Sequence, residues 1–598
     1  MRTKLTRSWI TLALLTALSV CLHAESHLPI EGQVANFQLL DQNGVSRELY
    51  RQKLARAVVI FVTGNGCPIA RQSLPALKEI EAEFGSQGIR LWMLNANTQD
   101  DVESVRKEAD EFHNEFPILL DHGQWVAESL GITRTAEAIA INTKDWTVFY
   151  RGAVDDRLGY GTQKDKPEKT FLKTALQHFL AAEPVVEARS AVKGCAINFA
   201  QPAPASKGPT TYVQHVAPIL RDQCVHCHSL GNIGPFAMAN YEKVKGWASM
   251  IREVLLEQRM PPWLADPQYG QFANHRGLSV EETQTIFRWV AQGTLRGEGE
   301  DPLLKQAPPT AGQWVLGKPD VVVGMPKEFS IPATGVIPYQ YFKVESTLTE
   351  DVWLRAAVVK PGNSKVLHHA LIFVQYPKEL KSIEPKQNAG TAGFFAGFVP
   401  GSDPVPFPEG TGKFLPKGTT FIFQIHYSPT GKEEVDRTEL GLYLLPSKPK
   451  WELRTRAVTQ HDLEIPPGAS NYTVQASYKF RKPSVLHDLS PHMHVRGASF
   501  KYQLKYPDGH SETLLSVPRW DFGWQTLYRL KEPKLIPAGA ELVCSGSFDN
   551  SGGNPANPDP KQWVIFGEQT TDEMFIGYYD IAVPPVEMVS KEPAVEPK

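Results

Sequence analysis

Hydrophobic and polar positions divide this chain into stretches of different periodicity. Between residues 29 and 184, short apolar runs alternate with segments of helical periodicity, which predicts an α/β domain with a mostly parallel sheet. The predicted strands are Ala57 to Thr63, Ile89 to Asn95 and Ile139 to Tyr150, and Pro75 to Phe84 is a predicted helix. We therefore expect an open sheet covered by helices in the first third of the chain.

Two further stretches follow the α/β domain. A polar linker at residues 185–209 leads into a helical segment at residues 210–300, which predicts a small all-α domain. Beyond a Pro-rich bridge, short alternating strands with Pro and Gly turns predict an all-β region. Its length indicates two sandwich units, residues 313–455 and 456–588, before a charged tail at residues 589–598.

The N-terminus has the features of an export signal. Three basic residues precede the apolar run Trp9 to Leu22, and we expect residues 1–24 to be removed. This run is too short for a transmembrane anchor, and no later segment reaches that length. Cys21 raises the question of a lipoprotein, but Val20 stands where lipid-attachment sites have a small residue. We therefore expect an exported protein, most simply in a bacterial periplasm.

Composition argues against several classes of partner and against one kind of structural scaffold. The 598 residues carry a formal net charge of −3 with no basic block, which argues against nucleic acid and anionic membranes. Six cysteines are too few for a disulfide scaffold in a secreted chain of this length. Individual cysteines are therefore candidates for redox chemistry or cofactor attachment.

The helical segment begins with a CxxCH motif, which is typical of covalent c-type haem attachment. The thiols of Cys224 and Cys227 are expected to bind the haem, and His228 is placed to be an axial iron ligand. An export signal agrees with this prediction, because c-type haem is attached outside the cytoplasm. A zinc site or a disulfide is the alternative for this pair of cysteines.

The second axial ligand is expected downstream of the motif. Met260, in the sequence RMPPW, is the best candidate because a thioether raises the potential of a haem with a histidine ligand. Met250 and His275 are weaker candidates, and Met260 could instead fill the core. The segment resembles small cytochromes c over about 90 residues, including its closing helix at Ile286 to Gly293.

Four short motifs in the all-β region contain possible metal ligands. They are His368 and His369 in VLHHALIFV, His426 in FQIHYSP, His492 and His494 in SPHMHVRG, and Met574 in TTDEMFIGYYD. Imidazole suits copper, and a thioether selects Cu(I). Residues two apart on a strand share a face, so His492 and His494 can bind one ion together. Adjacent His368 and His369 can do so only at a strand end or a bulge; taken singly, each residue could equally be structural.

The order of these motifs resembles the copper type II, ascorbate-dependent monooxygenases, which include peptidylglycine α-hydroxylating monooxygenase and dopamine β-monooxygenase. The resemblance covers about Gly317 to Pro585 and fills all six copper-ligand positions. It implies two jelly-roll-like β-sandwiches that face each other across a cleft. An electron-transfer copper would be held by His368, His369 and His426. The copper that binds O2 and hydroxylates a substrate C–H bond would be held by His492, His494 and Met574.

The resemblance extends to two further residues and then stops. Gln424 matches a family position near the electron path, and Tyr578 matches a tyrosine of the substrate pocket. Ser490 replaces the arginine that binds the substrate carboxylate in peptide-amidating members, and Ile576 replaces their pocket asparagine. With Cys544 as its one cysteine, this region cannot form the family's disulfides. These departures argue against peptidylglycine as the substrate.

Cys67 follows the first buried strand and opens the predicted helix, where thioredoxin-like and peroxiredoxin-like redoxins have a reactive thiol. A helix N-terminus favours thiolate. However, Ala70 replaces the second cysteine of a CxxC motif, Gly64 replaces the peroxidase threonine, and Ala136 replaces the usual cis-proline. Cys195 could be a distant partner thiol, or the domain could serve docking or copper delivery instead.

Together these features predict an exported oxidoreductase that hydroxylates a small organic substrate with O2 at a two-copper site. An external donor, an ascorbate-like reductant or a redox protein, would reduce the haem at His228, which would supply the copper. Two alternatives stay open: a non-catalytic electron-transfer or copper-handling protein, and a thiol-disulfide oxidoreductase or peroxidase acting through Cys67.

Overall fold

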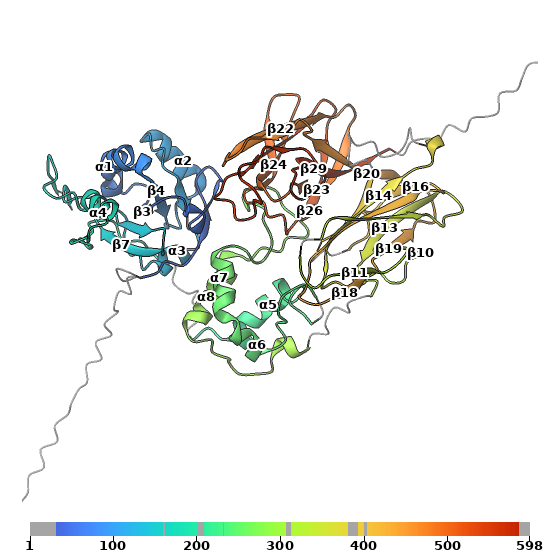
Figure 1. Cartoon of the computed structure of the whole chain (residues 1–598), viewed down its shortest axis with the longest axis horizontal. Coiled ribbons are helices and arrows are strands. Elements are labelled where there is room, and N and C mark those ends of the chain that lie inside the picture. The colour runs from blue at the N-terminus through green and yellow to red at the C-terminus, as the bar shows by residue number, and fades with distance from the viewer. Residues whose placement is uncertain are drawn as a thin grey trace, which may run out of the picture.

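The fold is taken from a computed structural model. It describes residues 32–159, 162–199, 208–230, 232–305, 313–335, 337–380, 393–399 and 404–584. The predicted export signal and C-terminal tail lie outside these ranges. In Figure 1 the chain runs from an N-terminal α/β domain through a group of helices to a β region of several sheets. None of the helices in the described ranges is long and apolar enough to cross a membrane.

The N-terminal domain has a five-stranded sheet with the order β5-β4-β3-β6-β7. The strands are β3 (Ala57–Thr63), β4 (Ile89–Asn95), β5 (Ile118–Leu120), β6 (Ala138–Asn142) and β7 (Thr147–Gly152). The pairs β3–β4 and β4–β5 are parallel, and β3–β6 and β6–β7 are antiparallel. The prediction of a mostly parallel sheet was therefore wrong.

One predicted strand, Ile139 to Tyr150, is in fact the hairpin of β6 and β7. Its polar centre forms a turn, in which Oδ1 of Asp145 accepts hydrogen bonds from the backbone N and the hydroxyl of Thr147. An Asp side chain that bonds to the backbone two residues on is typical of turns. The turn reverses the chain between the two strands and makes the pairing of β6 with β7 antiparallel.

Helices cover both faces of this sheet. They are α1 (Pro68–Phe84), α2 (Val102–Glu111), α3 (Trp125–Ser129) and α4 (Phe171–Leu180). Along β3, Ala57, Val59 and Phe61 pack in one core with α1, α2 and α4. The alternate residues Val58, Ile60 and Val62 belong to a second core on the other face, as the two-residue period of a strand requires. Burial on both faces explains the uninterrupted apolar run of β3.

Short elements complete the domain. They are β1 (Gln38–Leu40), β2 (Ser46–Glu48), β8 (Leu158–Gly159), β9 (Thr162–Gln163) and the 3-10 turns η1 (Tyr50–Gln52) and η2 (Gly85–Gln87). Residues of the predicted linker also belong here: Arg189 forms a bridge with Arg151, and Ala196 forms one with Arg134. The N-terminal domain therefore extends beyond residue 184.

The next segment contains only helical elements among its described residues. They are the π-helical turn η3 (Tyr212–Val216), α5 (Ala217–Gln223), α6 (Tyr241–Gly246), α7 (Ala248–Leu256), α8 (Val280–Ala291) and the 3-10 turn η4 (Pro302–Lys305). Ser279 begins α8 with a capping box, in which its hydroxyl accepts from the backbone N of Glu282 and the Glu282 carboxylate accepts from the backbone N of Ser279.

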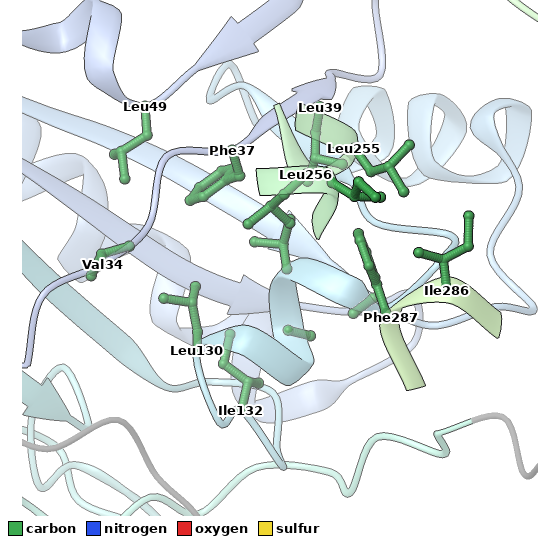
Figure 2. Close-up of a cluster of buried hydrophobic side chains, with 14 of the residues drawn as sticks. Val34, Phe37, Leu39, Leu49, Leu130, Ile132, Leu255, Leu256, Ile286 and Phe287 are labelled. Atoms are coloured by element: carbon green, nitrogen blue, oxygen red, sulfur yellow. The ribbon is translucent and has the colours of Figure 1, made fainter. Parts of the chain in front are cut away.

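Helices α7 and α8 share a hydrophobic core with the N-terminal domain. Figure 2 shows Leu256 and Phe287 of these helices beside Phe37 and Leu39. The ring centroids of Phe287 and Trp125 are 6.1 Å apart, and the side chain of Gln284 donates to the carbonyl of Gly123 at 2.9 Å. The helical segment therefore covers part of a sheet face that α3, with five residues, cannot cover alone.

The same segment also packs into the β region. Leu264 and Phe272 belong to the core of the C-terminal β unit, and Phe272 forms a β-bridge with Leu530. The backbone N of Asp266 donates to the carbonyl of Ser516 at 2.8 Å. The helical segment is therefore held between the α/β domain and the C-terminal half of the β region.

An eight-stranded sheet runs through both halves of the β region, with the order β10-β19-β13-β16-β20-β29-β23-β26. A short parallel pairing of Thr411 and Gly412 in β16 with Trp451 and Glu452 in β20 joins the halves. A four-stranded sheet, β12-β17-β14-β15, belongs to the first half, and another, β22-β27-β24-β25, belongs to the second. The predicted boundary at residue 455 falls inside β20, so the two predicted sandwiches share one sheet.

The strands of the β region have the following bounds. They are β10 (Val321–Gly324), β11 (Phe329–Ile331), β12 (Gln340–Glu345), β13 (Val352–Lys360), β14 (Leu367–Gln375), β15 (Phe394–Phe398), β16 (Thr411–Leu415), β17 (Thr420–Tyr427), β18 (Glu434–Asp436), β19 (Glu439–Leu444), β20 (Trp451–Thr459), β21 (Glu464–Ile465), β22 (Tyr472–Lys479), β23 (Ser484–His492), β24 (Gly497–Lys505), β25 (Ser511–Val517), β26 (Tyr528–Ile536), β27 (Glu541–Phe548), β28 (Val564–Ile565) and β29 (Ile576–Val583), with a 3-10 turn η5 (Lys378–Leu380).

Candidate functional site

Three histidines from two neighbouring strands meet in the first half of the β region. His368 and His369 lie at the start of β14, and His426 lies near the end of its partner β17. The pairing shifts register between Leu367 and His369, and this bulge breaks the alternation of side chains. Ring nitrogens of all three histidines lie within 4.8 Å of one another. The bulge thus supplies the condition under which two adjacent histidines can share an ion.

Burial and hydrogen bonding of this group suit a metal ion. Nε2 of His369 and Nδ1 of His426 are buried, and neither has a hydrogen-bond partner within the described part of the chain. Burial lowers the pKa of His426 to about 4 and also lowers the pKa of His369, so both rings are neutral at neutral pH. Buried neutral nitrogens without partners are costly unless a ligand occupies them. The residues therefore fit the predicted copper.

A second pair of histidines lies at the end of β23. His492 is the last residue of that strand, His494 follows two residues later, and their ring centroids are 5.3 Å apart. Nδ1 of His492 is 2.6 Å from Oε1 of Gln525, and Nδ1 of His494 is 3.1 Å from the carbonyl oxygen of Asp572. Oxygen acceptors at Nδ1 orient each ring and leave Nε2 for a ligand, as is usual for metal-bound histidines.

Met574 lies two residues before β29 and is 6% exposed. The carboxylate of the preceding residue, Glu573, accepts hydrogen bonds from the backbone N of His494 at 2.8 Å and of Arg496 at 2.6 Å. This one side chain ties the segment that carries Met574 to the loop that carries His494. The three residues predicted for the second copper therefore lie on adjoining segments, and their nitrogen and sulfur donors fit that ion.

Phe522 lies between the two histidine groups. Its ring centroid is 6.2, 6.1 and 5.8 Å from those of His368, His369 and His426, and 5.9 Å from that of His494. Neither Phe522 nor Gln525 was predicted from the sequence, because neither residue belongs to a recognisable motif. Both lie on the loop between β25 and β26, which therefore contacts both candidate copper sites.

Gln424 and Tyr578 are the residues predicted near the electron path and in the substrate pocket. Gln424 shares the half-buried face of β17 with His426, and its side chain donates to the hydroxyl of Tyr341 at 2.9 Å. Tyr578 is buried, and its ring centroid is 6.3 Å from that of His492. Its partner across the sheet is Ser490, so no basic side chain replaces the family's arginine at that position. The fully buried Ile576 adds apolar surface beside it.

The CxxCH motif forms a turn directly after α5. The backbone N atoms of Cys227 and His228 donate to the carbonyl of Cys224 at 3.1 and 3.0 Å. Nδ1 of the buried His228 is 3.0 Å from the carbonyl oxygen of Phe236, which orients the ring and leaves Nε2 for an axial bond. A Cβ on Gly234 would lie 2.9 Å from Nδ1 of His228, so a glycine is needed where the loop crosses the ring. The donor set fits a covalently attached haem.

Met260 follows the end of α7 and is partly exposed. Its backbone N donates to the carbonyl of Val254 at 3.3 Å, which folds the chain back over the last turn of the helix. Its role as the second haem ligand remains a prediction. Nearby, the side chain of Arg519 donates to the carbonyl of Gln258 at 2.6 Å. This bond joins the segment around Met260 to the strand end that precedes Phe522.

Cys67 caps the N-terminus of α1 and contacts a second thiol. Its Sγ is 3.2 Å from Sγ of Cys195, which is 128 residues away in the sequence, and 3.1 Å from Oγ1 of Thr135. Burial raises the pKa of Cys67, but hydrogen bonds with Thr135, the backbone of Ala70 and Cys195 outweigh it, and the pKa lies below the usual value. The hydrogen bond to Cys67 raises the pKa of Cys195. The domain therefore has a thiol pair although its CxxC motif is incomplete.

Known proteins resemble the N-terminal part of the chain. The model of the AhpC/TSA family matches residues 30–153. The thiol-disulfide oxidoreductase ResA of Halalkalibacterium halodurans is 30% identical over 145 residues, which are 23% of this chain and 81% of that protein. An uncharacterized conserved protein from Geobacillus kaustophilus is 25% identical, covering 30% of this chain and 96% of that chain, with a TM-score of 0.27. The thioredoxin domain of a thiol-disulfide oxidoreductase from Bacteroides vulgatus is 17% identical, covering 26% and 99%, with a TM-score of 0.21.

Proposed function

This chain belongs to the AhpC/TSA family through its N-terminal, thioredoxin-like redox domain, and from that premise we propose that it is a multi-centre oxidoreductase with a copper monooxygenase site in its β region. The observation that carries this proposal is the convergence of His368, His369 and His426 at the bulge of β14. The second histidine pair, His492 and His494, lies on the other side of Phe522.

The chain's residues would hold two copper ions in different ways. The first site would offer three imidazoles, those of His368, His369 and His426. The second site would combine the imidazoles of His492 and His494 with the thioether of Met574. Copper bound at these residues would supply single-electron transfer and reaction with O2. Phe522 would keep the two groups apart at a fixed spacing and exclude water between them.

The residues around Met574 indicate the class of substrate. Tyr578 offers one hydroxyl group, Ile576 offers apolar surface, and Ser490 stands where a carboxylate-binding arginine would be. With a serine at position 490, a substrate carboxylate beside Tyr578 would lose its hydration without the compensating charge that the family's arginine supplies. We therefore propose a small, uncharged organic substrate whose C–H bond is placed beside His492 and Tyr578.

Electrons for this reaction would come through the haem attached at Cys224 and Cys227. The bond from Arg519 to Gln258 fixes the segment of Met260 against the loop that contains Phe522. Cys224, Cys227 and His228 would hold the haem, which would supply outer-sphere electron transfer between an external donor and the copper site at His426. In stopped-flow spectroscopy, reduced haem should reoxidise in the copper-loaded protein given O2 and substrate. Haem that stays reduced under these conditions would exclude this route.

Oxygen uptake tests the monooxygenase activity itself. With ascorbate supplied as the electron donor, the copper-loaded chain should consume O2 above the ascorbate background only when a suitable member of a panel of small organic compounds is present, and it should form a hydroxylated product and water. A variant with His494→Ala should bind copper at the first site and lose this uptake. Two bound copper ions without any substrate-dependent uptake would favour a copper-handling or electron-transfer protein instead.

A second function is favoured by a separate observation, the contact between the thiols of Cys67 and Cys195. The named relative is a thiol-disulfide oxidoreductase, and we extend that activity to this domain. The two sulfur atoms would cycle between a dithiol and a disulfide, exchanging two electrons with an external thiol pair. Peptide mapping of the air-oxidised full chain should find the Cys67–Cys195 disulfide, and both cysteines alkylated after reduction. Absence of that disulfide would exclude this function without touching the copper proposal.

A further inference from the structure

Two aspartates lie directly opposite each other on adjacent strands of the eight-stranded sheet. Asp488 of β23 and Asp580 of β29 are partners in the antiparallel register, so their side chains stand on the same face. Asp488 is 7% exposed, and its Oδ1 is buried without a hydrogen-bond partner within the described part of the chain. Like charges at such positions repel each other, so ionising both carboxyl groups is costly.

Two cations and one histidine flank this pair. Nζ of Lys413 in β16 is 3.5 Å from Oδ2 of Asp580, and Nε of Arg529 in β26 is 3.7 Å from Oδ1 of Asp488. Both distances exceed those of a normal hydrogen bond, so the cations reduce the repulsion without replacing the lost hydration. His487, at the bulge of β23, adds no charge at neutral pH because burial lowers its pKa.

These surroundings favour a proton on Asp488. Burial and the charge of Asp580 raise the pKa of Asp488 to about 7, although Arg529 and Lys413 act in the opposite direction. Two carboxyl groups that share a site commonly keep one proton between them. A group with a pKa close to the working pH can both release and regain a proton, as a general acid must.

The same face of the sheet leads from this pair to the second candidate copper site. Asp488, Ser490 and His492 follow one another at two-residue steps along β23, and each step is about 7 Å long. On β29, Tyr578 stands opposite Ser490 in the same register that places Asp580 opposite Asp488. Hydroxyl groups, which can donate and accept a hydrogen bond, therefore lie between the carboxyl pair and His492.

The pair also has a connection to solvent. Asp580 and Arg529 are partly exposed, whereas Asp488 is buried. A proton released by Asp488 can therefore be replaced from water through Asp580, without passing the copper site. The pair thus lies between solvent on one side and the hydroxyl groups on the other.

We propose that Asp488 and Asp580 share a proton and deliver it to the reaction at the second copper site. The hydroxyl groups of Ser490 and Tyr578 are the groups through which the proton passes. This role rests on the proposed monooxygenase function.

The role is set by the balance of the reaction. A substrate C–H bond, O2, two electrons and two protons become a hydroxyl group and water. The electrons come from the external donor, and one oxygen atom enters the substrate. Asp488 releases each proton toward the oxygen atom that becomes water, and the pair regains each one from solvent through Asp580.

Infrared spectroscopy tests whether the pair holds a proton. At about pH 6, below the pKa of Asp488, the full chain should show the C=O stretching band of a buried carboxyl group. This band should shift in D2O and be absent in Asp488→Asn. Asp462→Asn, at an exposed aspartate, is the matched control and should lose no such band. An unchanged spectrum in Asp488→Asn would overturn the inference, with no copper or substrate involved in the measurement.

Rates of substrate hydroxylation test the delivery of the proton. With ascorbate as the electron donor, the rate of the copper-loaded chain should fall as the pH rises through about 7, because the pair loses its proton. Asp488→Asn should be about 100-fold slower with an unchanged KM and two bound copper ions, and it should lack this fall. In Asp580→Asn the fall should move to lower pH, because the like charge that raises the pKa of Asp488 is gone. Asp462→Asn should keep the rate and the pH profile of the unaltered chain.

The outcomes separate this role from the proposed function. Equal rates in the unaltered chain and Asp488→Asn, or a slower Asp488→Asn with the same pH profile, would contradict proton delivery and leave the monooxygenase function intact. If Asp488→Asn does not fold or bind two copper ions, an unshifted profile in Asp580→Asn would contradict it instead. Absence of substrate-dependent O2 uptake in the unaltered chain would exclude the monooxygenase function and this role together.

Discussion

Oε1 of Gln525 lies 2.6 Å from Nδ1 of His492, although 33 residues separate them in the sequence. The amide therefore fixes the orientation of a ring whose other nitrogen we assign to copper. The same loop carries Phe522 against the other histidine group. One loop thus contacts both candidate copper sites. Substitutions in this loop can therefore test the contribution of each site separately.

Replacing Gln525 with Ala should weaken copper binding at the second site only. The ring of His492 loses its acceptor, and such outer partners are worth about 10- to 100-fold in metal affinity. Titration of Cu(I) against a competing chelator should show one weakened and one unchanged site. The exposed Gln475 on β22 offers a control, because Gln475→Ala should change neither affinity. Equal weakening of both sites would argue against the role given to Gln525.

Replacing Gly194 with Ala should displace the segment of residues 188–197, which carries Cys195 and which we call the strap. The new Cβ would meet the carbonyl oxygen of Thr135, so Cys195 can no longer keep its place beside Cys67. A shift of this size should slow disulfide formation about 10- to 100-fold, because the reaction depends on the alignment of the two sulfur atoms. The rate after transfer from reducing buffer into oxidised glutathione measures this. Gly208→Ala, with open space around its Cβ, should leave the rate unchanged.

Replacing Glu137 with Ala should destabilise the N-terminal domain. Glu137 and Arg151 form an ion pair at 2.5 Å with side chains 8% and 2% exposed. Removing one partner leaves a buried charge uncompensated, which costs about 3–5 kcal/mol. Hydrogen exchange of peptides from β3 and β6 in increasing urea reports the loss. The exposed pair of Lys169 and Glu187 provides the comparison, and Glu187→Ala should cost less than about 1 kcal/mol. Similar losses in both variants would contradict this assignment.

Asp121 should make the same domain less stable as the pH rises. Burial raises the pKa of its carboxyl group from 3.8 to about 7. Between these values the unfolded chain has released a proton that the folded chain keeps, so the free energy of unfolding falls by up to about 1.4 kcal/mol per pH unit. In Asp121→Asn this contribution is absent. The difference between the two proteins should change between about pH 4 and pH 7 and be constant above it; a constant difference throughout would show that the pKa is not raised.

The thioredoxin-like fold and the bulge of β14 differ in how far sequence could predict them. The strands Ala57–Thr63 and Ile89–Asn95 were predicted at their observed bounds, because a continuous apolar run is what burial on both sheet faces requires. The hairpin of β6 and β7 was missed, since two apolar strands joined by a short polar turn resemble one long strand. The adjacent positions of His368 and His369 also indicated that a shared ion requires a strand end or a bulge. Which of the two occurs depends on pairing with another strand, so the sequence alone could not predict it.

The candidate sites, too, could be predicted from the sequence only in part. Ligand motifs are local, so the candidate histidines could be predicted from the order of their motifs and its resemblance to a known family. Gln525, Phe522 and the nearness of Cys195 to Cys67 depend on contacts between distant segments and leave no local signal. The two predicted sandwiches were separated at residue 455 because no pattern within one strand reveals that β16 and β20 pair across the boundary.

Copper stoichiometry tests the central proposal most directly. The full-length chain, loaded with Cu(I) and dialysed, should contain two copper ions by elemental analysis. His426→Ala should contain one, because it removes a ligand of the first site alone, and His510→Ala, at an exposed histidine, should contain two. One copper ion or fewer in the unaltered chain, or equal content in the unaltered chain and His426→Ala, would contradict the two-copper account.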